Sequence, residues 1–360
     1  MRINQDIARR CLVREEADRL LQWFYGHARI LPWREDKDPY RVWVSEIMLQ
    51  QTRVEAVIPY FNRFMKELPT LKELACCEEG PLLKLWEGLG YYNRVRNMQK
   101  AAIQMMEVYE GNFPTTRSEL MKLKGIGSYT SGAIASIAFN QQEPAVDGNV
   151  LRVWMRVHDD FDDIAKQTTK TKVEQEIMNW IPTDFPGDFT QAIMELGATV
   201  CVPKGEPKCP ICPLVNFCKA KQNDHVNQIP VKTKAKPRKI QARTIIVVQK
   251  GNRVLLKKRE NKGLLAGLYE FINEEGQLEE KEVIEKIKEL GLNPIRISPM
   301  GEEKHIFSHI EWHMVGYLIK IDETQEDKGF LFADVDQLDK QYAIPSAYVA
   351  CRKQIRRKLE

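Results

Sequence analysis

A long stretch without acidic residues separates two parts of this 360-residue chain that differ in hydrophobic pattern. From His225 to Arg259 there are eleven Lys or Arg residues and no Asp or Glu. In the part before it, apolar residues recur at three- and four-residue spacing, for example at Val54, Val57, Ile58, Phe61, Phe64 and Met65. This spacing is typical of amphipathic helices, so we predict a mostly helical region over residues 1–222.

The part after the basic stretch is predicted to be α+β. Residues 244–259 (TIIVVQKGNRVLLKKR) hold two β-rich runs around Gly251-Asn252, which predicts a hairpin. A charged helix is expected at residues 278–290 and a strand at residues 309–321 (HIEWHMVGYLIKI).

The basic stretch itself is expected to act as a linker. Residues 231–243 (VKTKAKPRKIQAR) lack periodic apolar positions and contain a proline. A chain of 360 residues exceeds one typical core, so we place domains at 1–222 and 241–360, with the linker at 223–240. The linker is either solvated without a ligand or crosses a phosphate backbone, which its charge would favour.

The composition argues against a membrane or secreted protein. No apolar run approaches the ~20 residues needed to cross a bilayer. The first twenty residues carry charges throughout, so no signal peptide is expected, and we predict a cytoplasmic protein. The net charge of +4 is compatible with nucleic-acid binding but does not argue for it.

Half of the eight cysteines are concentrated within 18 residues, at Cys201, Cys209, Cys212 and Cys218. The gaps between them are seven, two and five residues. In a protein that is not secreted, such a group is typical of metal or cluster ligation rather than of disulfides. Four thiolates can bind one tetrahedral zinc or one 4Fe–4S cluster, and the presence of a single Cys-x-x-Cys pair favours the iron–sulfur cluster.

A glycine-rich turn lies in the middle of the helical region. Gly125 and Gly127 stand one residue apart in LKGIGSYT (residues 123–130). Backbone N–H groups of such a turn at a helix start can bind a phosphate, although a plain helix–helix turn would have the same pattern. Residues 120–124 (LMKLK) and 132–139 (GAIASIAF) suit helices, and the segment at about 120–140 resembles a helix-hairpin-helix.

About twenty residues further on, Asp147 and Asn149 lie in VDGNVLR (residues 146–152). Asp-Gly between apolar residues is an ordinary turn, but a carboxylate shortly after a phosphate-binding hairpin would lie beside a nucleotide sugar. The hairpin, Asp147 and the four-cysteine loop occur in the order that the endonuclease III superfamily of DNA glycosylases has, and the chain resembles that superfamily over roughly residues 25–220. The resemblance implies a 4Fe–4S cluster in the loop 201–218. The first cysteine gap in the superfamily is usually six residues long and is seven here.

Two positions narrow the resemblance. In bifunctional relatives the position of Tyr129 holds a lysine that attacks the sugar as a Schiff-base nucleophile, and tyrosine cannot form an imine. Glu46 lies in WVSEIMLQQT (residues 43–52), where the residue pattern alone predicts a solvent-exposed side chain. Together with LPWRE (31–35) and GLGYYNRVRN (88–97), this segment is similar to the adenine DNA glycosylase family.

The family resemblance implies a role for each of these residues. Glu46 would protonate adenine at N7, with a pKa raised by a closed pocket, and Asp147 would stabilise the oxocarbenium ion or trap it covalently. Tyr129 and Asn149 would orient Asp147 and the sugar. Gln191 stands where some relatives carry Glu, which weakens a catalytic role for it. DNA contacts are expected from Arg34, Gln51, Thr52, Tyr91, Gly125, Gly127 and Ser128, with Gln51 and Tyr91 wedged into the base stack.

The C-terminal part resembles the Nudix-like module of the same family. GLLAGLYEF (residues 263–271) fits the strand-and-loop pattern of that module. A Nudix hydrolase needs a Glu-rich helix for magnesium, and here that helix reads EKIKEL (285–290), so we expect binding rather than hydrolysis. Phe307, Ser308 and His309 match the loop that inspects 8-oxoguanine, whereas on their own they would predict only a turn at a strand edge.

The predicted protein is therefore a monomeric, monofunctional base-excision repair glycosylase. Its substrate would be double-stranded DNA with adenine opposite 8-oxoguanine or guanine, and the adenine would be flipped out of the helix before hydrolysis. On DNA it would be associated with the nucleoid. The alternatives are a bifunctional glycosylase/lyase of the endonuclease III type and a catalytically silent DNA-binding protein of the same fold. The presence of both Glu46 and Asp147 argues against the silent protein.

Overall fold

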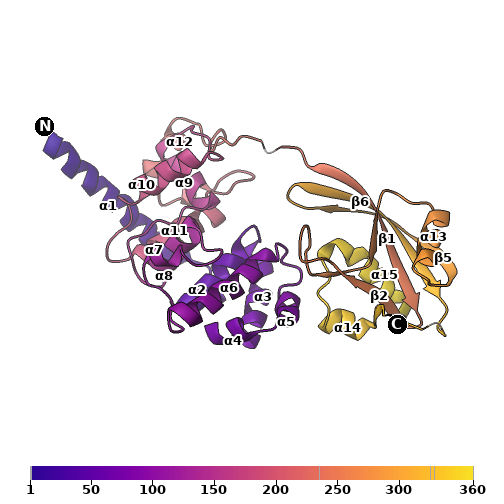
Figure 1. Ribbon diagram of the computed structural model, residues 1–360. Coiled ribbons are helices and arrows are strands. Elements are labelled where there is room, and N and C mark those ends of the chain that lie inside the picture. The colour runs from indigo at the N-terminus through magenta and orange to yellow at the C-terminus, as the bar shows by residue number, and fades with distance from the viewer. Residues whose placement is uncertain (1, 235, 325, 328, 360) are drawn as a thin grey trace. The chain divides into compact units, whose positions relative to one another are not determined.

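The computed structural model describes residues 2–234, 236–324, 326–327 and 329–359. The chain divides into two compact units. The first, which we call the helical unit, consists of Met1–Cys76 and Arg96–Lys234; the second, the sheet unit, consists of Cys77–Val95 and Ala235–Glu360. Figure 1 shows the helices of the first unit in indigo to magenta and the sheet of the second in orange to yellow.

The helical unit has no strand among its described residues. Its helices are α1 (Arg2–His27), η1 (Pro32–Arg34), α2 (Pro39–Leu49), α3 (Val54–Glu67), α4 (Leu71–Cys76), most of α6 (Asn93–Val108), α7 (Arg117–Leu120), α8 (Ser128–Ile137), α9 (Gly148–His158), α10 (Gln167–Ile177), α11 (Pro186–Thr199), η2 (Cys209–Ile211), η3 (Val215–Phe217) and α12 (Lys219–Gln222). No helix in the described ranges combines the length and the apolar character that crossing a membrane requires.

Helix α11 is the centre of this unit, because it packs against α1, α8 and α9. The core around it includes the fully or nearly fully buried Leu20, Trp154 and Phe189. Local signals set the helix starts: α2 begins with Pro39 after an N-cap at Asp38, whose carboxylate accepts hydrogen bonds from the Tyr40 and Arg41 amides. Helix α2 also packs against α8, so the start of the hairpin helix lies beside α2.

One predicted helix is wrong. Residues 120–124 were expected to be helical, but α7 ends at Leu120 and the chain continues as turns, with Leu123 N donating to Leu120 O at 3.1 Å. These turns lead into Gly125, which adopts φ of +80°. A right-handed helix cannot continue through that conformation, and an added Cβ there would lie 2.7 Å from Asn97 Cβ, so only glycine fits.

The sheet unit contains a seven-stranded mixed sheet in the order β3-β2-β1-β6-β5, with β4 paired to β1 and β7 paired to β2. Strands β1 and β6 run parallel, and all other pairs are antiparallel. The strands are β1 (Lys239–Lys250), β2 (Arg253–Lys258), β3 (Tyr269–Glu270), β4 (Ile272–Glu275), β5 (Pro294–Ile306), β6 (Ile310–Ile321) and β7 (Leu331–Ala333). The helices are α5 (Glu79–Leu85), α13 (Glu280–Glu289), α14 (Val335–Lys340), η4 (Ser346–Tyr348) and α15 (Val349–Leu359).

Alternate residues of β1 enter two cores on the two faces of the sheet. Ile245 and Val247 pack with residues of α14, η4 and α15, and Ile246 and Val248 pack with residues of α13. The predicted hairpin at Gly251-Asn252, the charged helix and the strand at 309–321 are confirmed as β1–β2, α13 and β6. The predicted fold class, a helical region followed by an α+β region, is confirmed as well.

Candidate active site

The helical unit holds a cavity of about 840 Å³ that is lined by parts of α2, α8, α9 and α11. Most of the residues singled out from the sequence line it. They are Arg34, Glu46, Gln51, Thr52, Gly125, Gly127, Ser128, Tyr129, Asp147 and Asn149, together with Gln191. Tyr91, Phe307, Ser308 and His309 belong to the sheet unit, and the four cysteines line a separate small cavity.

Glu46 lies on α2 and faces this cavity. The residue pattern predicted solvent exposure, but only 7% of the residue is exposed, because α2 packs against α8 on the side that carries Glu46. The Tyr129 hydroxyl donates to Glu46 Oε2 at 2.5 Å. Burial raises the pKa of Glu46 to about 7, although the hydrogen bond from Tyr129 opposes the rise. A carboxyl group with that pKa carries a proton in a large fraction of molecules at neutral pH.

Asp147 is held in a different environment. It is the N-cap of α9, and its Oδ1 accepts the amides of Asn149 and Val150, both at 2.8 Å. The Asn149 side-chain amide donates to Oδ2, also at 2.8 Å. Burial raises the pKa of Asp147, but these three hydrogen bonds favour the carboxylate and oppose the rise. The pocket thus contains two carboxyl groups with contrasting surroundings.

The position of Asn149 is fixed by α11 and by Arg152. A Cβ at Gly197 would lie 2.6 Å from Asn149 Cβ, so glycine at this position allows α11 to approach the start of α9. Arg152 Nη2 donates to Asn149 Oδ1 at 2.9 Å and to Gly197 O at 2.7 Å. Because Oδ1 is occupied by this donor, the amide nitrogen of Asn149 faces Asp147. Gly197 and Arg152 were not recognised from the sequence, where nothing marks them as neighbours of Asp147.

A buried ion-pair group forms another part of the wall. Glu195, which is 1% exposed, accepts Arg29 Nε at 2.6 Å and Arg34 Nη2 at 2.9 Å. Burial acts to raise the pKa of Glu195, but the two guanidinium groups hold it below its ordinary value. Arg34, which was predicted to contact DNA, is thus paired with Glu195 in this structure, and its contact with DNA stays a prediction. Sequence reasoning missed Arg29 and Glu195, which lie 166 positions apart.

The hairpin presents its glycines and the start of α8 to the cavity. Gly127 is the N-cap of α8, so the first amides of that helix have no partner within the helix. Ser128 Oγ donates to Glu174 Oε1 and accepts from Arg117 Nη2, each at 2.7 Å, so its hydroxyl already has two protein partners. Gln51, at the end of α2, is exposed and adopts φ of +60°, a conformation that costs free energy in a non-glycine residue.

In the sheet unit, Phe307, Ser308 and His309 form the turn between β5 and β6. Phe307 is anchored by ring contacts with Trp312 and His305, with centroids 4.9 Å and 4.6 Å apart. Ser308 and His309 are exposed, and Ser308 Oγ lies 2.9 Å from the Tyr91 hydroxyl. Tyr91 also has a left-handed backbone, with φ of +47°. The unit therefore places two residues predicted for DNA contact and lesion recognition next to each other.

The four clustered cysteines are all free and half-buried, and they line one cavity of about 30 Å³. Arg156 Nη1 donates to Cys201 Sγ at 3.2 Å and to Val202 O at 3.2 Å, so a cation stands next to the thiols. The described side chains, as placed, form no group of three or more ligands ready to hold a metal ion. The chemistry of the donors nevertheless fits a cluster, since four thiols around one cavity beside an arginine suit an anionic iron–sulfur group.

The fold and the pocket define a class of protein. Residues 44–183 match the HhH-GPD superfamily of base excision DNA repair proteins, and residues 243–354 match the NUDIX domain. The chain is 36% identical to an adenine DNA glycosylase of Mus musculus, over 85% of this chain and 70% of that protein. It is 35% identical to an adenine DNA glycosylase of Buchnera aphidicola subsp. Schizaphis graminum, over 84% and 86%.

The chain belongs to the adenine DNA glycosylase family. Adenine DNA glycosylase activity in base excision repair, with DNA as the substrate, follows from this membership. The helical fold is shared with endonuclease III in a non-covalent DNA complex, at 24% identity and a TM-score of 0.51 over 60% of this chain and 97% of that one. It is also shared with a thermostable thymine-DNA glycosylase, at 23% identity and 0.51 over 57% and 95%.

Proposed function

We propose that the enzyme hydrolyses the bond between a flipped-out adenine and its deoxyribose in the 840 Å³ cavity, with Glu46 as the general acid and Asp147 as the anionic partner. The contrast between the two carboxyl groups carries this proposal. Glu46 has a pKa of about 7, whereas Asp147 accepts three N–H hydrogen bonds. Groups with divergent environments are typical of acid–base pairs in glycoside hydrolysis.

The reaction balances with these two groups and one water molecule. Glu46 gives its proton to adenine N7 while the C1′–N9 bond breaks and its electron pair leaves with the base. The positive charge left on the sugar is stabilised by the Asp147 carboxylate, or is captured by it as a covalent ester. Water then adds at C1′, which releases the Asp147 carboxylate where the ester has formed, and the proton of the water restores Glu46. Burial and the neighbouring Glu46 hold the pKa of Tyr129 well above its ordinary value, so its hydroxyl remains a donor to Glu46.

The absence of an amine at position 129 supports a hydrolase that does not cleave the strand. Tyr129 lies beside Glu46, where a lysine could otherwise reach the sugar. Borohydride should therefore trap no covalent adduct between this protein and its substrate DNA. We also propose that the protein acts as a monomer and that Cys201, Cys209, Cys212 and Cys218 would hold a 4Fe–4S cluster that has no part in hydrolysis.

The decisive experiment uses the full chain and a duplex with one adenine opposite 8-oxoguanine. Free adenine should appear, and the DNA strand should remain intact until alkali is added. A parallel duplex with adenine opposite guanine measures the preference for the lesion. Strand cleavage together with a borohydride-trapped adduct would instead identify a bifunctional lyase.

We propose that the 307–309 turn supplies the preference for 8-oxoguanine. The lesion carries a hydrogen at N7 and an oxygen at C8, where guanine offers only an N7 acceptor. A hydroxyl such as that of Ser308 can accept from N7–H and donate to the C8 oxygen. Its exposed position at the tip of the β5–β6 hairpin, beside Tyr91, supports this role.

The double change Ser308→Ala and His309→Ala is therefore expected to lower the ratio of single-turnover rates opposite 8-oxoguanine and guanine by about five- to a hundredfold. Adenine release should survive, because Glu46 and Asp147 lie in the helical unit. Point variants are more informative than a truncation near Ile229, since the sheet unit also includes residues 77–95. Thr324→Ala, in another exposed loop of this unit, is the control. An unchanged ratio would assign lesion recognition to other residues.

A further inference from the structure

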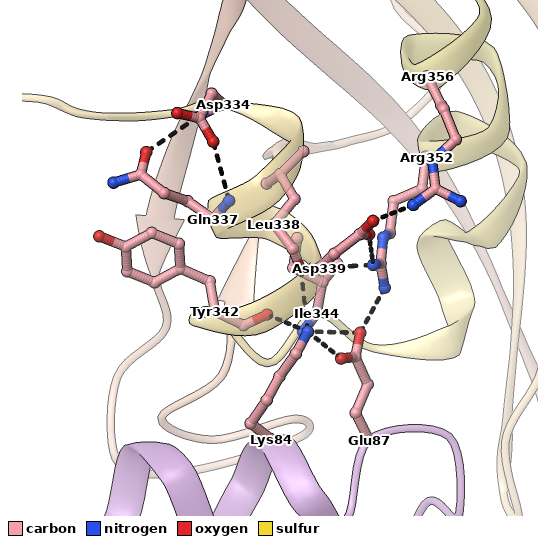
Figure 2. Close-up of polar contacts among 10 residues, drawn as sticks. All are labelled: Lys84, Glu87, Asp334, Gln337, Leu338, Asp339, Tyr342, Ile344, Arg352 and Arg356. Carbon is pink, nitrogen blue, oxygen red and sulfur yellow. Dashed lines mark hydrogen bonds and ion pairs between the residues drawn. The ribbon is translucent and has the colours of Figure 1, made fainter.

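Two charged residues attach the segment 77–95 to the rest of the sheet unit (Figure 2). Lys84, on α5, donates from Nζ to the carbonyl oxygens of Leu338 at 2.9 Å and Tyr342 at 3.0 Å. It also forms an ion pair with the carboxylate of Glu87. The three hydrogens of the ammonium group thus each have an acceptor. These contacts connect positions more than 250 residues apart in the sequence.

Glu87 makes a second set of contacts with the same region. Its Oε1 accepts from a guanidinium nitrogen of Arg352, on α15, and from the Ile344 amide at 3.4 Å. Arg352 in turn donates to Asp339 Oδ1 at 2.9 Å and to Leu338 O at 3.3 Å. In Figure 2, Lys84 and Glu87 rise from one segment toward the end of α14 and the side chain of Arg352. We call Lys84, Glu87 and Arg352 the clamp.

The clamp is well enclosed, because the side chains of Lys84 and Glu87 are only 13% and 15% exposed. Desolvation of two charges is unfavourable, and a well-packed apolar contact often stabilises a protein as much as a buried ion pair does. Unlike an apolar contact, the clamp is directional and fixes the orientation of the segment 77–95. Each of its hydrogen bonds specifies one orientation of the segment, and sliding the segment along the surface would leave buried charges without partners.

A short turn between Glu87 and Tyr91, held by side-chain hydrogen bonds, connects the clamp to Tyr91. Trp86 Nε1 donates to Gly90 O at 3.0 Å, and Arg94 Nη2 donates to Leu89 O at 3.0 Å and to Gly90 O at 3.2 Å. The Arg94 guanidinium also lies 5.6 Å from the centre of the Tyr91 ring. Tyr91 directly follows Gly90 in the sequence; it is 47% exposed and has a left-handed backbone conformation. Its hydroxyl is the group 2.9 Å from Ser308 Oγ.

We propose that Lys84 and Glu87 are positioning residues for lesion discrimination. They hold Tyr91 against Ser308, so that Tyr91 and the 307–309 turn act as one rigid element. This inference rests on the proposed role of the 307–309 turn. Neither residue lies among those that line the catalytic cavity, so we expect them to act on the choice between opposing bases rather than on bond cleavage. Lesion specificity in this enzyme then depends on a segment that the sequence places inside the catalytic region.

The test compares Lys84→Met and Glu87→Gln with the unaltered full chain. Single-turnover adenine release is measured opposite 8-oxoguanine and opposite guanine. The ratio of the two rates should fall by about five- to a hundredfold in each variant, as expected when a buried polar group loses its partner. Release opposite guanine should be retained. Lys340→Gln is the matched control, because Lys340 pairs with Asp336 on α14 with both side chains largely exposed.

A second comparison separates positioning from general stability. Tyr91→Phe removes only the hydroxyl that faces Ser308 and leaves the clamp intact. If the clamp acts through that contact, Lys84→Met combined with Tyr91→Phe should lower the ratio no further than the stronger single change. Additive effects, or equal losses of release opposite both bases, would overturn the inference. If the unaltered protein showed no preference for 8-oxoguanine, the proposed lesion reading itself would fail; a preference that survives the clamp variants overturns only the inference.

Discussion

Replacing Glu46 by Gln is expected to reduce adenine release by about 10²–10⁴-fold, because the amide cannot act as a general acid. The substitution preserves the shape of the side chain and leaves an oxygen that can accept the Tyr129 hydroxyl. Binding of substrate duplex should therefore remain close to that of the unaltered enzyme. The measurements are single-turnover release of adenine and the equilibrium affinity for the same duplex.

The pH dependence of the unaltered enzyme provides an independent check on Glu46. Its protonated form is the active one, so the rate should decrease as pH rises through about 7. Glu107→Gln, at an exposed position of α6 in the helical unit, is the matched control and should change neither the rate nor its pH dependence. Near-normal turnover of the Glu46 variant would remove Glu46 from the mechanism.

The same substitution should stabilise the folded protein at higher pH. The pKa of Glu46 is raised from 4.5 to about 7 on folding, so the protonated group contributes stability that is complete below pH 4.5 and is lost as pH rises through about 7. The glutamine does not titrate, and it escapes a loss of up to about 3 kcal/mol in the free energy of unfolding. Denaturant unfolding at about pH 5 and pH 8 should show the advantage of the variant growing with pH.

The sequence was most informative where the local backbone conformation requires a particular residue type. The tight turn at Gly125, which no other residue fits, could be predicted because local chemistry defines it. At Asp147 the residue pattern indicated only a turn, whereas the structure makes it the N-cap of α9. Glu46 was different. Its neighbours on α2 indicate an exposed position, and only the packing of α2 on α8, together with the family resemblance, places it in a cavity.

Features that depend on distant parts of the chain could not be predicted. The pairing of Arg29 and Arg34 with Glu195 joins the start of the helical unit to α11, and no periodicity marks either end. The assignment of residues 77–95 to the sheet unit was even harder to predict, because the helical spacing of apolar residues continues through that segment. What places it there is a set of contacts to residues about 250 positions later.

The four-cysteine loop leads to the second large expected effect. Cys212→Ser is expected to give protein without iron that is insoluble or has lost its affinity for DNA. The loop carries only short helical turns of its own, η2 and η3, and its four cysteines line one small cavity. Such a loop folds around its metal, so the free energy of binding is also free energy of folding.

Metal analysis, visible absorption and DNA affinity of the purified proteins measure this effect. The unaltered protein should be yellow-brown and contain iron rather than zinc. Cys76→Ser is the control, because Cys76 is exposed and lies outside the loop, and it should leave iron content and affinity unchanged. Stoichiometric zinc in protein handled without oxygen would show that the four thiols hold a tetrahedral ion, in spite of the single Cys-x-x-Cys pair. Iron retained by the Cys212 variant would show instead that the remaining three thiols suffice, and that the loop does not depend on its fourth ligand.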